Sequence, residues 1–202
     1  MAADGRYVTL ADVAQYLQVD ITDTDAAEDL SALVLTAEDL VDLYCNTIFD
    51  YTASDITRYF DGTNTDFIYL KRPIASITTI NLVDTSRVVV GNIPTYFLEP
   101  NNGFNNTATY LNVRSTQIFP KGVQNIQVIG KFGFSTIPRS VKLATKFIVK
   151  QLVDLRNQNT LLSFEKFIDR SASLSKNIQY LPPTARTLLE RWRLMDLDNY
   201  AW

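Results

Sequence analysis

The chain has 202 residues, of which 46% are hydrophobic and 20% are charged, and its formal net charge is −3. This composition supports one sizeable domain, or one domain with a large insertion, and it excludes disordered, collagen-like and disulfide-scaffold proteins. The chain has no histidine and one cysteine, which excludes histidine-based catalytic triads, imidazole metal sites and internal disulfides.

Charge is distributed unevenly along the chain. Residues 1–55 hold twelve acids and one base, for a net charge of −11, whereas the remaining residues hold eighteen bases and ten acids, for +8. Either the two parts neutralise each other within one subunit, or the acidic face of one copy meets the basic face of another. The negative total argues against tight nucleic-acid binding, because that affinity comes largely from phosphate neutralisation.

Glycine and proline divide the chain into three segments. Neither residue occurs between Gly5 and Gly62, whereas residues 62–138 hold six of the seven glycines and five of the seven prolines. This distribution predicts helical ends around a non-helical middle. We therefore predict an α+β fold, in which a helical bundle from the N- and C-terminal segments carries a large antiparallel β-rich insertion. The predicted boundaries are residues 1–55, 56–136 and 137–202, with the first and last segments packing as one helical domain.

The N-terminal segment has the pattern of two amphipathic helices. Thr9 with Asp12 predicts a capping box for a short first helix, and Asp25 with Glu28 predicts the same device for a longer second helix. The apolar positions of the second helix recur at steps of three and four, and Cys45 beside them is expected to be a small buried hydrophobe. Its acidic face is either solvated or a contact for a basic partner; it comprises Glu28, Glu38, Asp39 and Asp42.

The middle segment alternates short β-rich runs with turn signals. No helix-length crossover separates the runs, so we predict an antiparallel sheet. We expect the run from Asn101 to Thr109 to form an exposed loop tip. The predicted strands are Thr57–Phe60, Phe67–Leu70, Ser76–Leu82, Arg87–Val90, Tyr96–Glu99, Tyr110–Val113 and Val123–Phe134.

Pro138 is well placed to begin a C-terminal helix. The apolar residues of this helix fall within a narrow arc, Val141, Ala144, Ile148, Leu152 and Leu155. Its opposite face is basic, and is either solvated or a binding surface for acids or phosphates; that face comprises Arg139, Lys142, Lys146 and Lys150. A further helix is predicted near residues 160–170, and Pro182-Pro183 opens a last one. Tyr200 and Trp202 either pack on their own domain or anchor in a pocket of another protein.

No set of residues has the spacing of a catalytic or metal site. Asp61, Asn64 and Asp66 do not match a calcium loop, and Gly130 and Gly133 do not form a phosphate-binding loop. Acids of the second helix could hold magnesium for phosphodiester cleavage, but helix-surface acids are usually solvated. We therefore predict no enzyme activity, no metal and no cofactor. No apolar run is long enough to span a bilayer, so we expect no membrane partner, and synthesis in the cytoplasm.

Six motifs occur in order across about the first 80 and the last 80 residues. They are the helix Tyr7–Leu17, the acidic helix ending Leu43-Tyr44-Cys45-Asn46, the segment Arg58-Tyr59-Phe60-Asp61-Gly62, the Leu70–Ile74 turn with Ile77 and Ile80, the strand Ile126–Phe134 leading into Ile137-Pro138, and Leu181-Pro182-Pro183 with Arg191-Trp192-Arg193. Together these motifs resemble the head-tail connector, or adaptor, proteins of long-tailed bacteriophages. Residues 85–115 have no counterpart in this resemblance.

The resemblance implies a structural role in the neck of the virion. Such proteins form a dodecameric ring beneath the portal, extend the DNA channel and seat the next neck or tail component. The expected partners are therefore other copies of the chain, the portal protein and a downstream neck or tail-completion protein. DNA would pass through the ring transiently and without specific binding.

Two surfaces are candidates for these contacts. For ring formation, the acidic face formed by Glu28, Glu38, Asp39 and Asp42 in one copy would approach the basic face formed by Arg139, Lys142, Lys146 and Lys150 in its neighbour. The resemblance further implies that the C-terminal end docks onto the portal, through Arg186, Arg191, Trp192, Arg193, Tyr200 and Trp202. The alternative is a monomeric binding module whose β-rich part presents the loop at residues 101–109 to a carbohydrate or a protein.

Overall fold

The computed structural model of the protein describes residues 4–157 and 181–194. The chain divides into two compact units, a helical unit that draws on residues 1–47 and 137–202 and a β unit that spans Ile48–Thr136. The helical unit contains helices from both ends of the chain, and all strand pairs of the β unit are antiparallel. The predicted α+β class is therefore confirmed.

The first two helices are α1 (Leu10–Leu17) and α2 (Thr24–Cys45). Thr9 caps α1 as predicted, because its Oγ1 accepts the Asp12 backbone N–H at 3.1 Å. The predicted cap of the second helix was wrong. Asp23, not Asp25, precedes α2, and its carboxylate accepts the Asp25 N–H at 3.2 Å. Aspartate at either position can accept a free N–H group of the first helical turn, so the sequence pattern alone could not show at which residue α2 begins.

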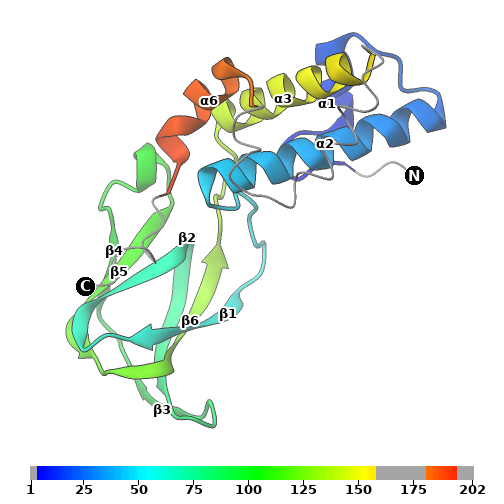
Figure 1. Ribbon diagram of the computed structural model, residues 1–202. Coiled ribbons are helices and arrows are strands. Elements are labelled where there is room, and N and C mark those ends of the chain that lie inside the picture. The colour runs from blue at the N-terminus through cyan, green and yellow to red at the C-terminus, as the bar shows by residue number, and fades with distance from the viewer. Residues whose placement is uncertain (1–3, 158–180, 195–202) are drawn as a thin grey trace. The chain divides into compact units, whose positions relative to one another are not determined.

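The C-terminal helices are α3 (Arg139–Asn157) and α6 (Pro183–Leu189), and the 3-10 helix η4 (Glu190–Trp192) follows α6. Within the helical unit, α3 contacts α1, α2 and α6 (Figure 1). The predicted apolar arc of α3 is confirmed at four of its five positions, Val141, Ala144, Ile148 and Leu152, which are at most 2% exposed. The helix predicted near residues 160–170 lies outside the described residues.

Six strands form the sheet of the β unit. They are β1 (Ile56–Gly62), β2 (Thr65–Val83), β3 (Val89–Asn92), β4 (Tyr96–Glu99), β5 (Tyr110–Phe119) and β6 (Gly122–Phe132). The strand order is β1-β6-β2-β5-β4, and β3 pairs with β2. Each predicted strand overlaps one of these, and the antiparallel arrangement is confirmed.

Strand β2 corrects one prediction, since no turn separates the runs on either side of residues 70–74. The strand continues through this stretch and pairs first with β5 and then with β6. Ile74 is paired with both Tyr110 and Phe132, at the point where the two ladders meet. Pro73 lacks an N–H group but lies at the register shifts, where a missing donor is tolerated. This change of partner makes the sheet curl (Figure 1).

The inner side of the curled sheet holds the core of the β unit. Its central members are fully or almost fully buried, and β-branched and aromatic residues dominate. Together they make one continuous apolar cluster, formed by Ile68, Leu70, Ile74, Ile80, Ile93, Val113, Phe119, Ile126, Val128 and Phe132.

The loop between β4 and β5 is less exposed than predicted. Asn101 and Asn102 are exposed, but Thr109 is 1% exposed, and Phe104 places its ring 6.4 Å from the ring of Phe134. The Phe104 backbone N–H also donates to the Thr109 carbonyl at 2.6 Å. Part of the loop therefore folds back on the β unit, and the exposed tip that the sequence predicted is limited to Asn101, Asn102, Asn106 and Ala108.

Candidate assembly surfaces

Glu38 lies inside the helical unit and not on its acidic face. Its carboxylate is 0% exposed and accepts the backbone N–H groups of Tyr7 at 2.7 Å, Arg6 at 2.9 Å and Val8 at 3.4 Å. A buried carboxylate is tolerated when its oxygens are satisfied in this way. The prediction that Glu38 belongs to the contact surface was therefore wrong. It instead fastens the segment before α1 to the middle of α2.

Asp42 is also largely withdrawn from the surface, since its side chain is 15% exposed. It accepts a hydrogen bond from the Tyr7 hydroxyl and pairs with the Arg6 guanidinium at 3.0 Å. Burial raises the pKa of Asp42 to about 6, although the Tyr7 hydroxyl and the Arg6 charge both act in the opposite direction. Asp42 is therefore a partly buried group of the subunit, with little surface left for another copy.

Arg6 is the one base among the first 55 residues, and it neutralises part of the acidic face. Its guanidinium lies 3.0 Å from both Asp39 and Asp42 and 3.5 Å from Glu38. Asp39 is 80% exposed, so its pair with Arg6 is solvent-screened. Part of the acidic charge is thus balanced within the subunit, and Glu28 and Asp39 remain as the predicted contact acids that are exposed.

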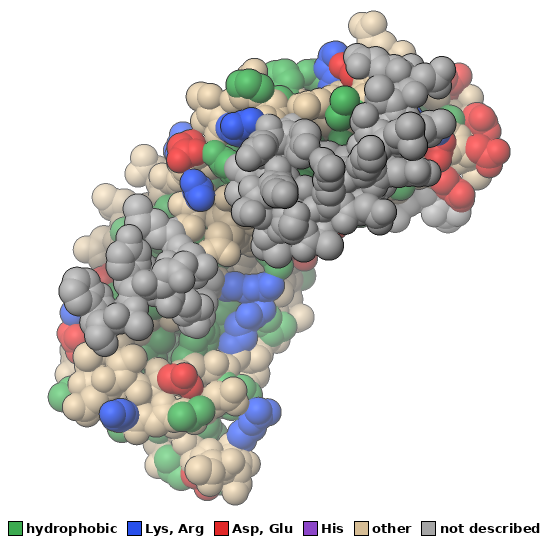
Figure 2. Space-filling model, viewed as in Figure 1, with side chains coloured by type: hydrophobic (Ala, Val, Ile, Leu, Met, Phe, Trp, Pro, Cys, Tyr) green, Lys and Arg blue, Asp and Glu red, His purple; other side chains and the backbone are tan. Residues whose placement is uncertain are grey.

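The acidic charge that stays on the surface gathers at the beginning of α2. Figure 2 shows acidic side chains at this end of the helical unit. The exposed acids of this region are Asp20, Asp23, Asp25, Glu28 and Asp29.

The basic face of α3 is exposed as predicted at three of its four residues, whereas Lys146 is half-buried. Lys150 pairs with Asp154 one turn later at 2.9 Å. Arg139, Lys142 and Lys146 form no ion pair with the residues that the structure describes. Three cations on one face of α3 therefore lack an acidic partner within the described subunit.

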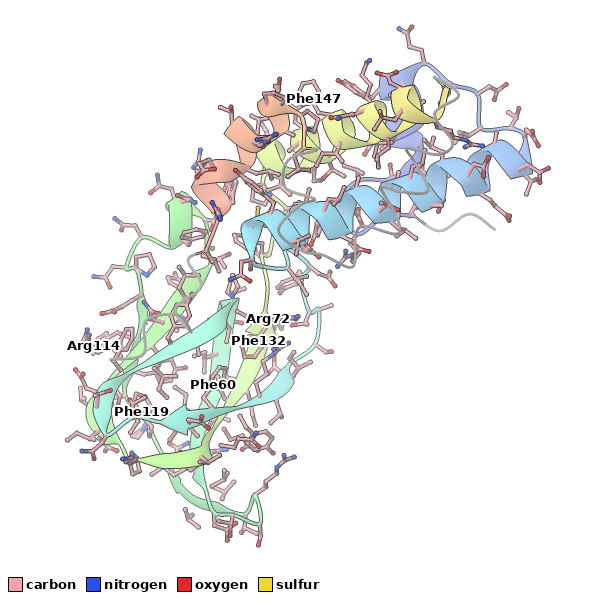
Figure 3. All side chains as sticks on the ribbon, in the orientation of Figure 1. Phe60, Arg72, Arg114, Phe119, Phe132 and Phe147 are labelled. Carbon is pink, nitrogen blue, oxygen red and sulfur yellow. The ribbon has the colours of Figure 1, made fainter. Side chains whose placement is uncertain are left out.

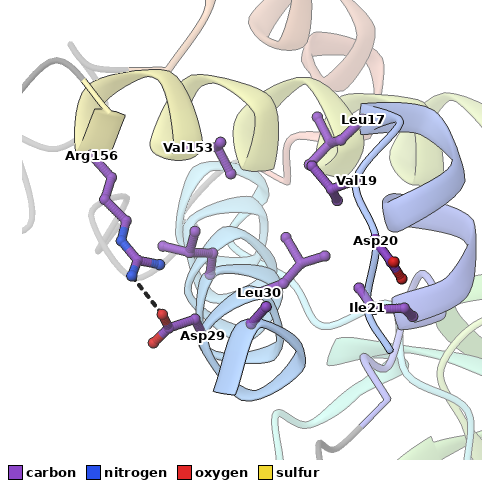
Figure 4. Close-up of a pocket in the computed structure, with 10 residues that line it drawn as sticks. Leu17, Val19, Asp20, Ile21, Asp29, Leu30, Val153 and Arg156 are labelled. Carbon is purple, nitrogen blue, oxygen red and sulfur yellow. Dashed lines mark hydrogen bonds and ion pairs between the residues drawn. The ribbon is translucent and has the colours of Figure 1, made fainter. Parts of the chain in front are cut away.

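One ion pair between helices was not anticipated from the sequence. Arg156, in the last turn of α3, lies 2.5 Å from Asp29 of α2. The pair borders a hollow of about 390 Å³ whose other walls are mainly aliphatic, among them Leu17, Val19 and Leu30 (Figure 4). A basic residue such as Arg156 is common in the last turn of a helix. Its partner Asp29 is 127 positions away in the sequence, so spacing alone could not predict the pair.

Trp192 corrects the predicted portal-docking group. It is 3% exposed, and its Nε1 donates to the Ser140 hydroxyl at 2.7 Å. Tryptophan supplies a large apolar surface together with one polar group that needs a partner when buried, and Ser140 of α3 is that partner. The side chain of Trp192 is therefore part of the core of the helical unit and is not available as a surface anchor.

The arginines of the predicted docking group have different surroundings. Arg186 is half-buried, and its Nε donates to the Leu181 carbonyl at 2.9 Å. Arg191 and Arg193 are exposed and stack over the rings of Trp192 and Tyr44, at 4.9 and 5.6 Å from the ring centroids. Two docking candidates thus remain on the described surface. Tyr200 and Trp202 lie outside the described residues.

The predicted role of Cys45 as a buried hydrophobe is confirmed. The side chain is 0% exposed, and burial raises the pKa of its thiol to about 12. Among the described residues, no group of three or more acids and cysteines is arranged to hold a metal ion. None of the described helices is both long and apolar enough to cross a membrane.

A protein-family model described as "Head completion protein" matches residues 6–195 of the chain. No curated protein matches it. The family match therefore covers both the helical unit and the β unit.

Three similar solved structures come from gene transfer agent (GTA) particles. A chain of the "Neck of empty GTA particle computed with C6 symmetry" is 16% identical with a TM-score of 0.58, and the match covers 96% of this chain and 93% of that one. A chain of the "Virion of native gene transfer agent (GTA) particle" is 17% identical with the same TM-score and coverage. A chain of the "Neck of native GTA particle computed with C12 symmetry" is 16% identical with a TM-score of 0.55, covering 92% and 88%. At these identities the likeness establishes a shared fold.

Proposed function

The chain belongs to the head completion protein family, and we propose on that basis that it is a structural component of the virion neck. In this proposal a ring of copies lies beneath the portal, extends the DNA channel and seats the next neck or tail component. The observation that carries the proposal is the family match, which spans residues 6–195. The family assignment is to a structural virion protein and not to an enzyme.

The proposed ring requires two different surfaces on each subunit that fit one another and close after a fixed number of copies. The C12 symmetry named for one similar neck structure supports a ring of twelve. The net charge of −3 suits a conduit for DNA, because a channel protein must not hold the phosphates that pass it.

The subunit contact is proposed between α2 of one copy and α3 of the next. Glu28 and Asp39 supply the acidic side, since they are exposed whereas Glu38 is buried and Asp42 is largely buried. The basic side is formed by the α3 cations without an ion pair in the described chain, Arg139, Lys142 and Lys146. Complementary charges of this kind guide association and weaken with added salt.

Charge reversal on α3 tests the ring. The full chain carrying Lys142→Glu and Lys146→Glu should assemble less than the natural chain when the cognate portal is added at low salt, with mass photometry as the measurement. Lys121→Glu is the matched control, because Lys121 is an exposed lysine of the β unit. Equal assembly of all three proteins would refute the α2–α3 contact. A chain that stays monomeric on its portal in every form would refute the ring itself.

The C-terminal end is proposed to dock onto the portal. Arg191 and Arg193 are exposed and belong to this surface, together with residues 195–202. A chain that ends at Leu194 keeps the buried Trp192 and should remain folded, but its retention on immobilised portal should fall. A portal contact made many times around a ring would gain avidity from each copy. Undiminished retention would reject this docking surface.

We also propose that the N- and C-terminal segments act as one helical bundle and one domain, and that the β-rich residues 56–136 are an insertion in the sequence of that domain. The packing of α3 against α1, α2 and α6 supports this arrangement. The competing function, a monomeric carbohydrate- or protein-binding module, predicts a chain that stays monomeric with portal present.

A further inference from the structure

The β unit contains a hollow of about 660 Å³ between β1 and the beginning of β2. Its walls combine aromatic and aliphatic side chains, such as Phe60 and Leu70, with three arginines, Arg58, Arg72 and Arg87. Figure 2 shows basic side chains close to exposed hydrophobic ones on this face of the β unit. The hollow thus offers both apolar contact and positive charge.

Arg58 is unusual because it extends along the core side of the sheet. It shares its face of β1 with Ile56 and Phe60, which pack against the apolar core, and its guanidinium lies 4.9 Å from the centroid of the Phe132 ring. Its Nε is buried and has no hydrogen-bond partner in the described chain. A buried donor without an acceptor costs free energy, so a partner that supplies the acceptor gains from binding here.

Arg72 brings a second positive charge to the same place. It lies on the face of β2 that carries Ile68 and Leu70, and it appears near Phe132 in Figure 3. Burial and then the charge of Arg72 lower the pKa of Arg58, and no carboxylate offsets them. Neither arginine forms an ion pair within the described residues. Two like charges therefore converge in a partly desolvated hollow without a counter-ion.

Arg114 shows how an arginine of the same unit is normally neutralised. It is exposed, yet it pairs with Asp66 at 2.7 Å and with Glu99 at 2.9 Å. All three arginines belong to strands of one sheet, but within the described residues Arg114 has two acidic partners whereas Arg58 and Arg72 have none.

The rim of the hollow adds a third guanidinium. Arg87 lies 4.5 Å from the centroid of the Tyr59 ring and donates to the Gln124 side chain at 3.4 Å. Asp61 is the one acid among the described lining residues, and its carboxylate accepts the Gln124 backbone N–H at 2.7 Å. The rim therefore increases the positive charge, while the lining acid is already engaged.

A strand edge also faces the hollow. β1 is the end strand of the sheet and pairs with β6 alone in the described chain, while the first part of β2 pairs with β5. An end strand offers backbone N–H and C=O groups to an added extended segment.

We propose that this hollow binds the carboxylates of an acidic, extended segment of a partner protein, with Arg58 and Arg72 as the anion-binding pair. The planar guanidinium matches a carboxylate with two parallel hydrogen bonds. The recessed apolar walls and the chain's net charge of −3 favour a protein segment over DNA. This site lies within one subunit and does not depend on the proposed ring.

The test uses the full chain and a synthetic peptide of alternating glutamate and valine, with binding measured by calorimetry at low salt. The double variant Arg58→Gln, Arg72→Gln should lose at least about tenfold in affinity for the peptide. Arg114→Gln is the matched control and should bind as the natural chain does, because that arginine is neutralised by its own acids. The peptide affinity of Arg58→Lys should lie between that of the natural chain and that of the double variant, since lysine keeps the charge but cannot form two parallel hydrogen bonds to a carboxylate.

A parallel titration with short duplex DNA separates the two sources of anions. The proposal of a protein partner would be overturned if the natural chain bound duplex DNA more tightly than the peptide and the double variant lost this DNA binding. Absence of peptide binding to the natural chain would overturn the site, and so would equal binding by the double variant. Melting curves establish that each variant is folded, and the lysine variant keeps the test valid should the double variant unfold.

Discussion

The Glu38 carboxylate accepts the Tyr7 backbone N–H at 2.7 Å and thereby ties residues 31 positions apart. The same carboxylate accepts the N–H groups of Arg6 and Val8. One buried side chain thus satisfies three backbone donors that precede α1 and have no helical partner of their own. The acid that the sequence assigned to an assembly surface is instead a structural link within the subunit.

Glu38→Gln should therefore destabilise the helical unit. The neutral amide keeps one acceptor oxygen but directs an NH₂ group at backbone donors, so we expect a loss of about 2 kcal/mol in the free energy of unfolding, measured with urea. Asp39→Asn is the control, because Asp39 is 80% exposed and its pair with Arg6 is worth less than about 1 kcal/mol. Equal stability of the two variants would contradict the structural role of Glu38.

Asp42 gives the helical unit a specific dependence on pH. Its pKa is about 6 in the folded chain against 3.8 for the ordinary carboxyl, mainly because of burial. Between these values the folded chain keeps a proton that the unfolded chain has released, so this contribution to stability falls as pH rises from about 4 to about 6. We expect a loss on the order of 2 kcal/mol over this range, after allowance for residual solvent screening.

The measurement is the free energy of unfolding across this range, compared between the natural chain and Asp42→Asn. The difference between the two curves isolates the contribution of residue 42. Asp20→Asn provides a control of opposite sign, because the Thr22 N–H lowers the pKa of Asp20. Parallel curves for the natural chain and Asp42→Asn would contradict the assignment.

Features set by near neighbours in the sequence could be predicted. Thr9 caps α1 because its partner is three residues away, and the apolar arc of α3 follows from helical spacing alone. The order of several such local motifs also carried the resemblance to head-tail connector proteins, which is confirmed by the family to which the chain belongs.

Features set by distant partners could not be predicted in this way. Spacing placed Glu38 away from the apolar stripe, but it could not show that three backbone donors before α1 would enclose its carboxylate. Pro73 resembles a turn residue in the sequence, and only the exchange of β5 for β6 explains why the strand continues. Sequence spacing also could not show that Arg58 of β1 and Arg72 of β2 lie close together, because the curl of the sheet brings these two strands near each other.

Trp192 and the adjacent arginines should separate stability from portal docking. Trp192→Ala removes a buried ring and leaves a cavity, so we expect a loss of about 3 to 5 kcal/mol in stability. The double variant Arg191→Ser, Arg193→Ser changes exposed side chains and should alter stability by less than about 1 kcal/mol while it reduces binding to immobilised portal.

The comparison is completed with Trp192→Phe, which keeps most of the packing and removes the hydrogen bond to Ser140. It should remain folded and bind the portal normally. Portal binding that is lost in Trp192→Phe but kept in the arginine double variant would contradict this division of roles.

Gly133 holds the end of β6 in a conformation that other residues do not adopt without strain. Its φ is +97°, and a Cβ atom there would lie 1.5 Å from the Asp50 carbonyl oxygen. Gly133→Ala therefore requires the backbone of one segment to move, and we expect it to destabilise the β unit by at least about 2 kcal/mol. Gly91→Ala is the matched control, since its Cβ would meet Leu82 at an ordinary 3.4 Å. Hydrogen exchange of the β-unit amides in the full chain measures both effects, and similar protection in the two variants would contradict the predicted strain.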